Sequence, residues 1–304
     1  MSAQRVLVSG AGGFVGHALS VGFASLGWQV TAVDVHFDEG VRTRLARVDL
    51  VEADLGERLL PELPRFDVVV HAAALTTDPS ELGCTRAEHL AANMRPLLTV
   101  MEHAARSRPA AFVFLSSSGV FSDGDGRDTL TDADHPTGCT PYAVAKQVGE
   151  RLVHAAFGGA PTPHVVRLGY VYGPHESSRP SRRRVSLVAE WLRAARDGRP
   201  LEVRADDPAR DWTFAPDLAP ALARLVDAPG AGRPLHLCSP HIVRDRALAA
   251  LVSRRHPGTS LVTVPASTRV KPPMAPSDVA ALRGFAWTDP DVGLARLVGR
   301  EAVA

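Results

Sequence analysis

A cluster of glycines near the start of the chain constrains the fold more than any other feature. An apolar segment at residues 5–8 leads into VSGAGGFVG, and the helix-like run HALSVGFASLG follows. Glycine allows a tight turn and lets backbone N–H groups approach a phosphate at the positive end of a helix. A glycine-rich turn without a ligand has the same pattern. The strand before it and the helix after it favour a dinucleotide site at Gly10, Gly13 and Gly16, beside Phe14 and Val15.

Strand-like and helix-like segments alternate over about the first 170 residues, the rhythm of βαβ units. Short apolar runs predict strands at residues 5–8, 29–33, 66–70, 111–115 and 163–167, and longer segments predict helices at 88–106 and 142–157. We therefore expect an α/β fold, a doubly wound parallel sheet of the Rossmann type with a smaller C-terminal substrate-binding region. Residues 1–168 and a return of the chain near 208–236 are assigned to the Rossmann domain, and 169–207 and 237–304 to the smaller region.

An acidic residue closes the second predicted strand. Asp34 lies 24 residues after Gly10, where a carboxylate can accept hydrogen bonds from the adenosine ribose hydroxyls. A carboxylate repels a 2′-phosphate, and residues 35–39 contain no arginine, so NAD is favoured over NADP. Asp54 and Leu55, and then Ala72 and Ala73, close the next two strands. They leave room for adenine and pyrophosphate, or they form simple tight turns.

The segment TPYAVAK places Tyr142 and Lys146 on one face of a predicted helix, because residues i and i+4 are neighbours. The chain has three tyrosines, and two of its 34 basic residues are lysines, Lys146 and Lys271, which leaves 34 − 2 = 32 arginines. A nearby ammonium favours a phenolate, and its rotatable donors can bind ribose hydroxyls in a way that the planar arginine fork does not reproduce. The presence of a lysine at position 146, in a chain whose other basic residues are almost all arginines, therefore predicts a catalytic role for Tyr142.

Charge, apolar runs and cysteine content indicate which kinds of partner the protein binds and in which cellular compartment it lies. A net charge of +1 provides no long-range field for nucleic acid or an anionic membrane, and no apolar run is long enough to span a bilayer. The N-terminus does not read as a signal peptide. The three cysteines have no metal-ligand spacing and are expected to be free thiols in a reducing cytoplasm, and no metal site is predicted.

Together these motifs resemble the short-chain dehydrogenase/reductase superfamily, specifically its extended branch of sugar epimerases, dehydratases and reductases. The resemblance covers nearly the whole chain. It rests on GAGGFVG, Asp34, Asp54–Leu55, HAAA, Asn93, SSSGVF, YAVAK, RLGYVYGP, ARDWTFAPDLA and RGFAWTDPDVGLARLV.

The resemblance implies a role for each matching residue. Tyr142 would be the general acid/base, and Lys146 would bind the nicotinamide ribose and tune Tyr142. The family's active Ser/Thr lies three residues before the Val of a Val-Tyr-Gly segment, which favours Ser117 over Ser118 as the hydrogen-bond donor to the substrate oxygen. Asn93 would lie near the cofactor.

Departures from the family pattern bear on the reaction. Family dehydratases follow the active Thr with an Asp-Glu pair, whereas Ser118 and Gly119 follow Ser117 here, which argues against dehydration. Two redox reactions stay open. An epimerase would keep NAD bound through the cycle, and a dehydrogenase or reductase would exchange it at each turnover.

The substrate signals conflict. Arg210 matches the family's diphosphate-binding arginine, and Arg269 or Lys271 lies where a second cation is often found, although each fits a surface charge in an arginine-rich chain. Tyr170 replaces an asparagine that helps to hold the sugar nucleotide. Residues 176–184 could cap the substrate site, where their arginines suit an acidic or phosphorylated ligand, or they form a solvated loop.

Three hypotheses follow. The leading one is an NAD-dependent enzyme acting on a secondary alcohol or ketone of a sugar nucleotide. The alternative is a dehydrogenase of a small free polyol, sugar acid or hydroxy acid. The third, a cofactor-sensing regulator, is disfavoured by the intact Tyr142/Lys146 pair. The resemblance also implies a homodimer formed through the helices at 88–106 and 142–157.

Overall fold

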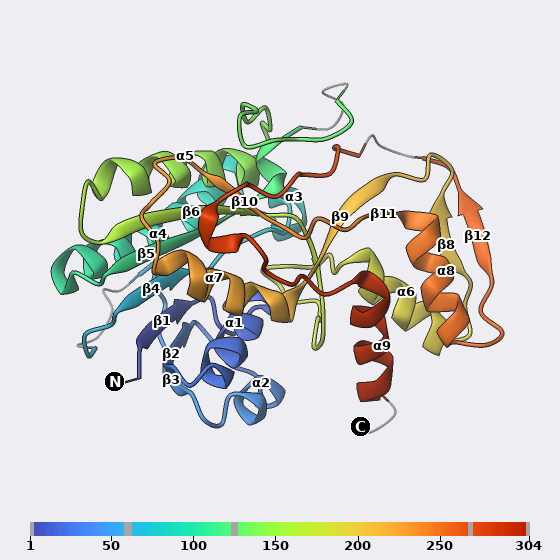
Figure 1. The fold of residues 1–304 in the computed structure, drawn as a ribbon, viewed down its shortest axis with the longest axis horizontal. Helices are drawn as coiled ribbons and strands as arrows, with labels where there is room; N and C mark the ends of the chain where they lie inside the picture. Colours follow the sequence, from blue (N-terminus) through green and yellow to red (C-terminus); the bar gives the residue numbers. More distant parts are fainter. Residues whose placement is uncertain (1–2, 58–62, 123–126, 267–269, 302–304) are drawn as a thin grey trace.

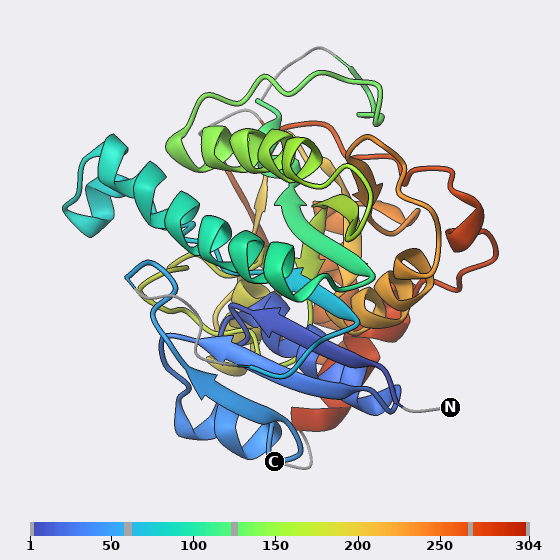
Figure 2. The same cartoon turned by 90° about the vertical axis from the view of Figure 1, so that its left-hand side faces the viewer.

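A parallel sheet forms the centre of the molecule in the computed structural model, which describes residues 3–57, 63–122, 127–266 and 270–301 (Figures 1 and 2). Within these residues the sheet has seven strands in the order β10-β6-β5-β4-β1-β2-β3, and every paired neighbour is parallel. The strands are β1 (Arg5–Ser9), β2 (Gln29–Asp34), β3 (Asp49–Glu52), β4 (Val68–His71), β5 (Ala111–Ser117), β6 (Thr162–Leu168) and β10 (Leu235–Leu237). The strand order reverses between β1 and β4, which is where open α/β sheets bind ligands.

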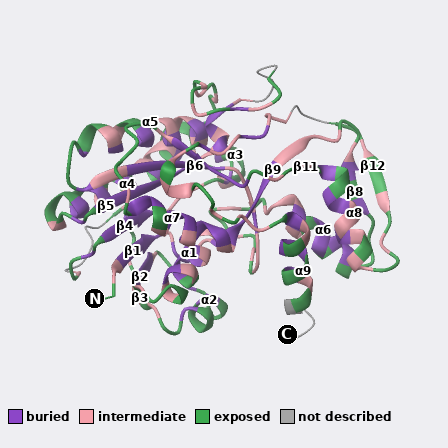
Figure 3. Cartoon of the chain, viewed as in Figure 1, coloured by how far each residue is buried: buried purple, intermediate pink, exposed green. Residues whose placement is uncertain are grey.

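Helices cover both faces of this sheet, because its central strands are apolar on both sides. Val6 and Val8 of β1 pack against α1 (Phe14–Ser25), α2 (Glu39–Arg44) and α7 (Leu218–Val226). Leu7, between them, faces α4 (Arg86–Ser107) and α5 (Pro141–Ala156) on the opposite side. Figure 3 shows the resulting buried band through the sheet. The short α3 (Pro79–Leu82) precedes α4.

Local sequence fixes where α4 and α5 begin. Thr85 and Glu88 form a capping box, in which the Thr85 Oγ1 accepts from the Glu88 N–H at 3.2 Å and Glu88 accepts from the Thr85 N–H at 2.7 Å. The Thr140 hydroxyl caps α5 by accepting from the Ala143 N–H at 3.1 Å, and Pro141 occupies the first turn, where its missing N–H costs nothing. Tyr142 is therefore held in the first turn of α5.

A glycine brings α5 close to the sheet. Gly149 faces the ring of Phe114 on β5, and a Cβ atom at this position would lie 2.5 Å from the Phe114 Cζ. Any larger residue would therefore force the helix or the ring to move. The phenylalanine also lies under the Lys146 ammonium, 4.8 Å from its ring centroid, so packing and site share this contact.

A smaller unit lies at one end of the sheet (Figure 1). It contains a three-stranded sheet in the order β11-β9-β7 and the parallel pair β12-β8. Its elements are β7 (Tyr170–Tyr172), α6 (Leu187–Arg196), β8 (Leu201–Arg204), β9 (Ala209–Phe214), β11 (Ile242–Arg244), α8 (Asp245–Arg255), β12 (Leu261–Val264) and α9 (Pro290–Glu301). Their apolar faces form a core of their own around Trp191 and Trp212.

The predicted α/β class and parallel sheet are confirmed. Of the expected return of the chain, α7 and β10 join the Rossmann side, whereas β9 lies in the smaller sheet. Part of the C-terminal stretch also returns, since Phe285 and Trp287 pack against the core that contains α7. The division at 1–168, 169–207, 208–236 and 237–304 stays a prediction. None of the described helices is long and apolar enough to cross a membrane.

Candidate active site

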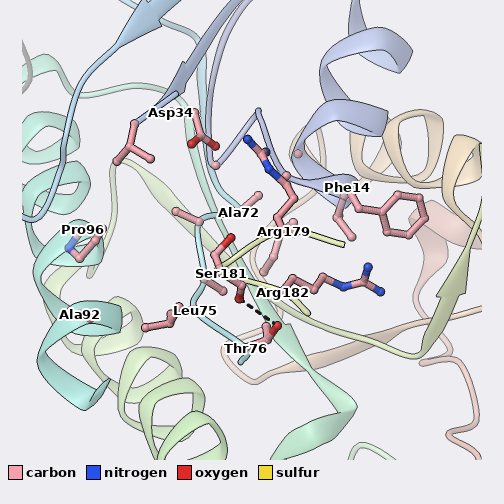
Figure 4. A pocket seen from close by; sticks show the side chains of 18 of the residues that line it. Phe14, Asp34, Ala72, Leu75, Thr76, Ala92, Pro96, Arg179, Ser181 and Arg182 are labelled. Atoms are coloured by element: carbon pink, nitrogen blue, oxygen red, sulfur yellow. Dashed lines mark hydrogen bonds between the residues drawn. The ribbon is translucent and has the colours of Figure 1, made fainter. Parts of the chain in front are cut away.

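A cavity of about 780 Å³ opens at the carboxyl ends of β1, β2, β4 and β5 (Figure 4). It runs from the glycine-rich turn and the end of β2 to the first turn of α5. The sequence-predicted residues that line it are Gly10, Gly13, Phe14, Val15, Gly16, Asp34, Asp54, Leu55, Ala72, Ala73, Ser117, Tyr142 and Lys146. Their assignments to cofactor and substrate stay predictions, but the structure brings them together around one groove.

The glycine-rich turn leaves no space for side chains at Gly10, Gly12 or Gly16. A Cβ atom on Gly10, where φ is +75°, would lie 2.4 Å from the Ala73 N, and one on Gly16 would lie 2.2 Å from the Gly10 carbonyl oxygen. At Gly13 the nearest atom, the Gly10 carbonyl oxygen, would be 3.3 Å away, a tight contact that a Cβ atom could make only after a small shift. This cradle fits the pyrophosphate of a dinucleotide at the N-terminus of α1.

Asp34 closes the other side of this end of the groove. Its carboxylate accepts a hydrogen bond from the Gly12 N–H at 2.9 Å. Burial raises the pKa of Asp34, while the Gly12 hydrogen bond and the charge of Arg179 lower it. The carboxylate sits at the end of β2, as a ribose-binding acidic residue does in dinucleotide folds.

The proposed catalytic residues meet at the opposite end. Ser117 is the last residue of β5, and its Oγ accepts from the Gly119 N–H at 3.0 Å. A Cβ atom on Gly119 would lie 3.2 Å from both the Ser117 Oγ and the Tyr142 Cε1, so the serine and the tyrosine ring face one small space. A substrate oxygen placed there can hydrogen-bond both hydroxyl groups.

Lys146 lies one helical turn after Tyr142, with its ammonium 5.8 Å from the centroid of the tyrosine ring. The Nζ donates to the carbonyl oxygen of Leu115 at 2.7 Å. Burial lowers the pKa of Lys146 to about 8, and Glu150 opposes that shift. The lysine is therefore a fixed donor beside the groove with further N–H groups for a ribose.

One expectation for this pair is wrong in direction. Sequence reasoning expected the Lys146 ammonium to lower the pKa of Tyr142. Enclosure by the protein instead raises it, and the opposing influences are a hydrogen bond with Ser117 and the charge of Arg182. The Lys146 ammonium is instead bound to the carbonyl oxygen of Leu115. The hydrogen bond with Ser117 and the charge of Arg182 thus act on the pKa of Tyr142 in the direction expected of Lys146.

A buried ion pair supports α5 from behind. Arg167 on β6 donates to both Glu150 oxygens at 2.8 Å, and the Ser116 hydroxyl donates to the Glu150 Oε1 at 2.6 Å. Both charged side chains are less than one-tenth exposed. The network ties β5, β6 and α5 together directly behind Lys146.

Other candidates lie outside the cavity lining. Asn93 is buried in α4 and holds the loop after β4, accepting from the Leu75 N–H at 2.9 Å and donating to its carbonyl at 3.2 Å. Since Leu75 lines the cavity, Asn93 acts on the groove through this loop. Ser118 is buried in the 3₁₀ turn after β5 and does not line the cavity.

The predicted substrate contacts form a separate cluster. Tyr170 lies between two cations, with the Arg210 guanidinium 4.6 Å and the Lys271 ammonium 4.3 Å from its ring centroid. Lys271 also donates to the Tyr170 hydroxyl at 3.2 Å. Arg210 forms a bidentate pair with the buried Asp245, at 2.7 and 2.8 Å. Arg269 lies outside the described residues.

The residues that cover the groove belong to the segment that the sequence left open between a cap over the substrate site and a solvated loop. We call residues 174–186, between β7 and α6, the strap. Ser177, Arg179, Pro180, Ser181 and Arg182 of the strap line the cavity. The run of arginines was the available signal, and it left an acidic ligand and a solvated loop equally open. Within the described ranges, no cluster of three or more His, Cys, Asp or Glu side chains is placed to hold a metal.

Comparison with known proteins agrees with this geometry. The model of the NAD dependent epimerase/dehydratase family matches residues 6–241, more than half of the chain. The chain belongs to this family.

Curated relatives carry names of sugar-nucleotide enzymes. The dTDP-4-dehydrorhamnose reductase of Mycobacterium tuberculosis is 30% identical over 294 residues, covering 93% of this chain and 86% of that protein. The reductase of the same name from Mycolicibacterium smegmatis is 30% identical over 227 residues, covering 74% and 61%. An uncharacterized UDP-glucose epimerase of Bacillus subtilis, YtcB, is 27% identical over 190 residues, covering 62% and 56%. The chain thus spans less than two thirds of the length of the last two.

Solved structures share the fold over almost the full chain. MoeE5 in complex with UDP-glucose and NAD has a TM-score of 0.76 at 25% identity, covering 99% of this chain and 100% of that one. The UDP-glucose 4-epimerase of Thermotoga maritima, solved with UDP-glucose, has a TM-score of 0.81 at 18% identity and the same coverage. The second likeness concerns the fold alone.

Proposed function

We propose that the protein is an NAD-dependent enzyme that oxidises or reduces a secondary alcohol or ketone of a sugar nucleotide. The observation that carries the proposal is the single groove with Asp34 at one end and Ser117, Tyr142 and Lys146 at the other. Gly10, Gly13, Gly16 and Asp34 would hold the adenosine and pyrophosphate half of NAD, and Lys146 its second ribose. When bound, NAD accepts or delivers a hydride.

The protein's own groups handle the proton and the orientation of the substrate. Ser117 donates a hydrogen bond to the substrate oxygen, and Tyr142 takes a proton from the hydroxyl or returns one to the carbonyl. Lys146 fixes the ribose and adds positive charge near the phenol. Ala72, Ala73 and Leu55 supply small apolar walls that exclude water from the dinucleotide.

The sugar-nucleotide class is supported by the relatives' names and by the cationic cluster at Tyr170. Lys271 and Arg210 flank this ring beyond β7, whose Val171 lines the cavity. Cations so placed suit the diphosphate of a nucleotide. The Arg210–Asp245 pair favours the second candidate, a dehydrogenase of a small free polyol, sugar acid or hydroxy acid, because that arginine is already engaged by a carboxylate.

A panel of ligands distinguishes the sugar-nucleotide enzyme from the dehydrogenase of a small free substrate. The purified protein is mixed with NAD and with UDP-, dTDP- and GDP-hexoses or free polyols and sugar acids, and its thermal unfolding is followed. We expect NAD to raise Tm and a nucleotide sugar to raise it further, because ligands that bind only the folded state stabilise it. Stabilisation and turnover with the free polyols or acids alone would replace the first candidate by the second.

We also propose a cytoplasmic homodimer. The exposed faces of α4 and α5 carry Leu98 and Val148, and the two helices pack side by side on the outside of the sheet. A second copy placed on this face would bury both side chains. Cys84, Cys139 and Cys238 are all free thiols, which fits a reducing compartment. Light scattering of the wild type against a Leu98→Glu/Val148→Glu variant tests the dimer.

A further inference from the structure

The strap is attached to one bank of the groove through the loop after β4. The Thr76 and Thr77 N–H groups donate to the Ser181 carbonyl oxygen at 2.8 and 3.2 Å. The Thr77 hydroxyl donates to the Pro180 carbonyl oxygen at 2.8 Å and accepts from the Arg183 N–H at 3.1 Å. Thr77 is buried. These bonds fix the middle of the strap against the loop that follows β4.

Arg179 attaches the strap to the opposite bank. Its guanidinium donates to the carbonyl oxygens of Gly12 and His36, the latter at 3.3 Å. A Cβ atom on Gly12 would lie 2.9 Å from the Arg179 Nη1 and 3.0 Å from the Asp34 Cγ, so guanidinium and carboxylate face one small volume. Figure 4 shows Arg179 reaching toward Asp34 across the groove.

The hairpin that carries Arg179 is held in shape by its own bonds. Arg179 and Arg182 exchange backbone hydrogen bonds at 3.0 and 2.9 Å. Glu176 accepts from the Arg182 guanidinium at 2.5 Å and from the Ser186 N–H at 2.7 Å. Arg182 points away from Asp34 and lies over the Phe14 ring, 5.3 Å from its centroid (Figure 4). The arginines therefore lie in fixed positions above the groove.

The strap thus roofs a groove whose floor is the glycine-rich turn. Residues 179–182 and the glycine-rich turn line the same cavity, so a dinucleotide that runs from Asp34 to Tyr142 would lie beside both. A guanidinium has five N–H donors, and the bonds to Gly12 and His36 use two of them. Arg179 lines the same cavity as the cradle that fits an anionic pyrophosphate, and Arg–phosphate contacts are among the strong hydrogen bonds.

We propose that Arg179 is a cofactor-binding residue, which holds the adenosine and pyrophosphate half of the dinucleotide from the strap and keeps it bound between turnovers. This inference rests on the proposed function. A retained cofactor favours epimerisation over net reduction. The substrate carbon would pass a hydride to the retained NAD while its hydroxyl passes a proton to Tyr142; the hydride would then return to the other face of the carbonyl carbon, and the proton to its oxygen. No external oxidant or reductant is consumed.

The test measures release of the cofactor, not turnover. Wild type, Arg179→Gln and Arg179→Lys are loaded with NADH, mixed with excess NAD, and the decay of bound NADH fluorescence is followed. The matched control is Arg183→Gln, because Arg183 lies in the same strap but pairs with Glu81 at 3.7 Å and does not line the cavity. Thermal unfolding without nucleotide shows whether each variant is folded.

We expect Arg179→Gln to release NADH at least tenfold faster than wild type, Arg179→Lys to fall between them, and Arg183→Gln to stay within twofold. Equal release by wild type and a folded Arg179→Gln would overturn the inference while leaving the proposed function intact. Acceleration by Arg183→Gln as large as that by Arg179→Gln would also overturn it, since strap integrity alone would then set the rate. A wild type that binds neither NAD nor NADH would overturn the proposed function and the inference together.

Discussion

The Lys146 ammonium donates a hydrogen bond to the carbonyl oxygen of Leu115 on β5 at 2.7 Å while lying 4.8 Å from the Phe114 ring centroid. The contact fixes the lysine between helix and sheet, at the end of the groove that Ser117 and Tyr142 line. Little space is left for a larger head group, because Gly149 already packs α5 closely onto the same phenylalanine.

Lys146→Arg is therefore expected to keep the charge and lose function. An extra planar group in this packed position costs on the order of 1–3 kcal/mol and displaces the donors from the groove. We expect kcat to fall about 100-fold or more and NAD binding to weaken, as measured by steady-state kinetics and NADH titration. Lys146→Met provides the comparison without charge. Wild-type turnover by the arginine variant would show that charge alone suffices.

The pH profile provides a separate check on Lys146. Burial lowers its pKa to about 8, so the ammonium is lost as pH rises through that value. Activity that depends on the charged lysine should be full below about pH 8 and should decline above it. The residual activity of Lys146→Arg should not show this decline, because arginine stays protonated. An identical alkaline limb in the two proteins would assign the limb to another group.

Tyr142→Phe is expected to separate chemistry from binding. Removing the phenol oxygen takes away the proton donor and acceptor beside Ser117, a contribution of about 100- to 10,000-fold in rate. The ring remains in the first turn of α5, so NAD should bind within a few-fold of wild type in a fluorescence titration. Turnover close to that of wild type would remove Tyr142 from the catalytic residues.

Asp34→Ala is expected to relax the preference for NAD over NADP. The carboxylate that repels a 2′-phosphate disappears, while the Arg179 guanidinium, which faces the same volume, remains. We expect the ratio of NAD to NADP affinity to fall at least tenfold, measured by competitive titration. Adding Arg179→Gln to Asp34→Ala should reverse much of the gain for NADP. An unchanged ratio in Asp34→Ala would count against the assignment of this residue.

Glu150→Gln is expected to destabilise the fold. The change leaves the buried Arg167 guanidinium without its carboxylate, and breaking such a pair costs about 3–5 kcal/mol. The free energy of unfolding is measured by urea denaturation. The dependence of this free energy on urea concentration should be the same in the wild type and the variants. Glu102→Gln is the control, because Glu102 pairs with Arg106 at 3.7 Å on the exposed face of α4 and should change stability by less than about 0.5 kcal/mol. Equal effects of the two changes would contradict a structural role for the buried pair.

The residues show which parts of this architecture can be predicted from sequence. Gly10, Gly16 and Asp34 were identifiable because the turn, the strand end and the spacing are local. Tyr170 shows the limit of a motif match. Gly169 and Val171 line the cavity, and the alternation of side chains along β7 turns Tyr170 to the other face, toward Arg210 and Lys271.

Long-range contacts explain the rest. The hydrogen bond from Arg179 to Gly12 joins residues 167 positions apart, and no periodic pattern in the sequence of the strap predicts it. The pKa direction of Tyr142 was missed for a related reason. Helical spacing places Lys146 on the same face, but only the position of β5 shows that its ammonium points to Leu115. The spacing of residues within one helix or strand can be predicted from the sequence. The contact that a flexible side chain makes with a neighbouring element cannot.

The absence of a side chain at Gly149 has a consequence for engineering this protein. Mutant libraries for a new substrate are commonly confined to positions that line the cavity, and Gly149 is not among them. Yet this position sets the height of α5 over the sheet, and the same helix carries Tyr142 and Lys146. A substitution at Gly149, which does not line the cavity, would therefore change the separation between Tyr142 and Ser117. A library that omits Gly149 leaves that separation unchanged.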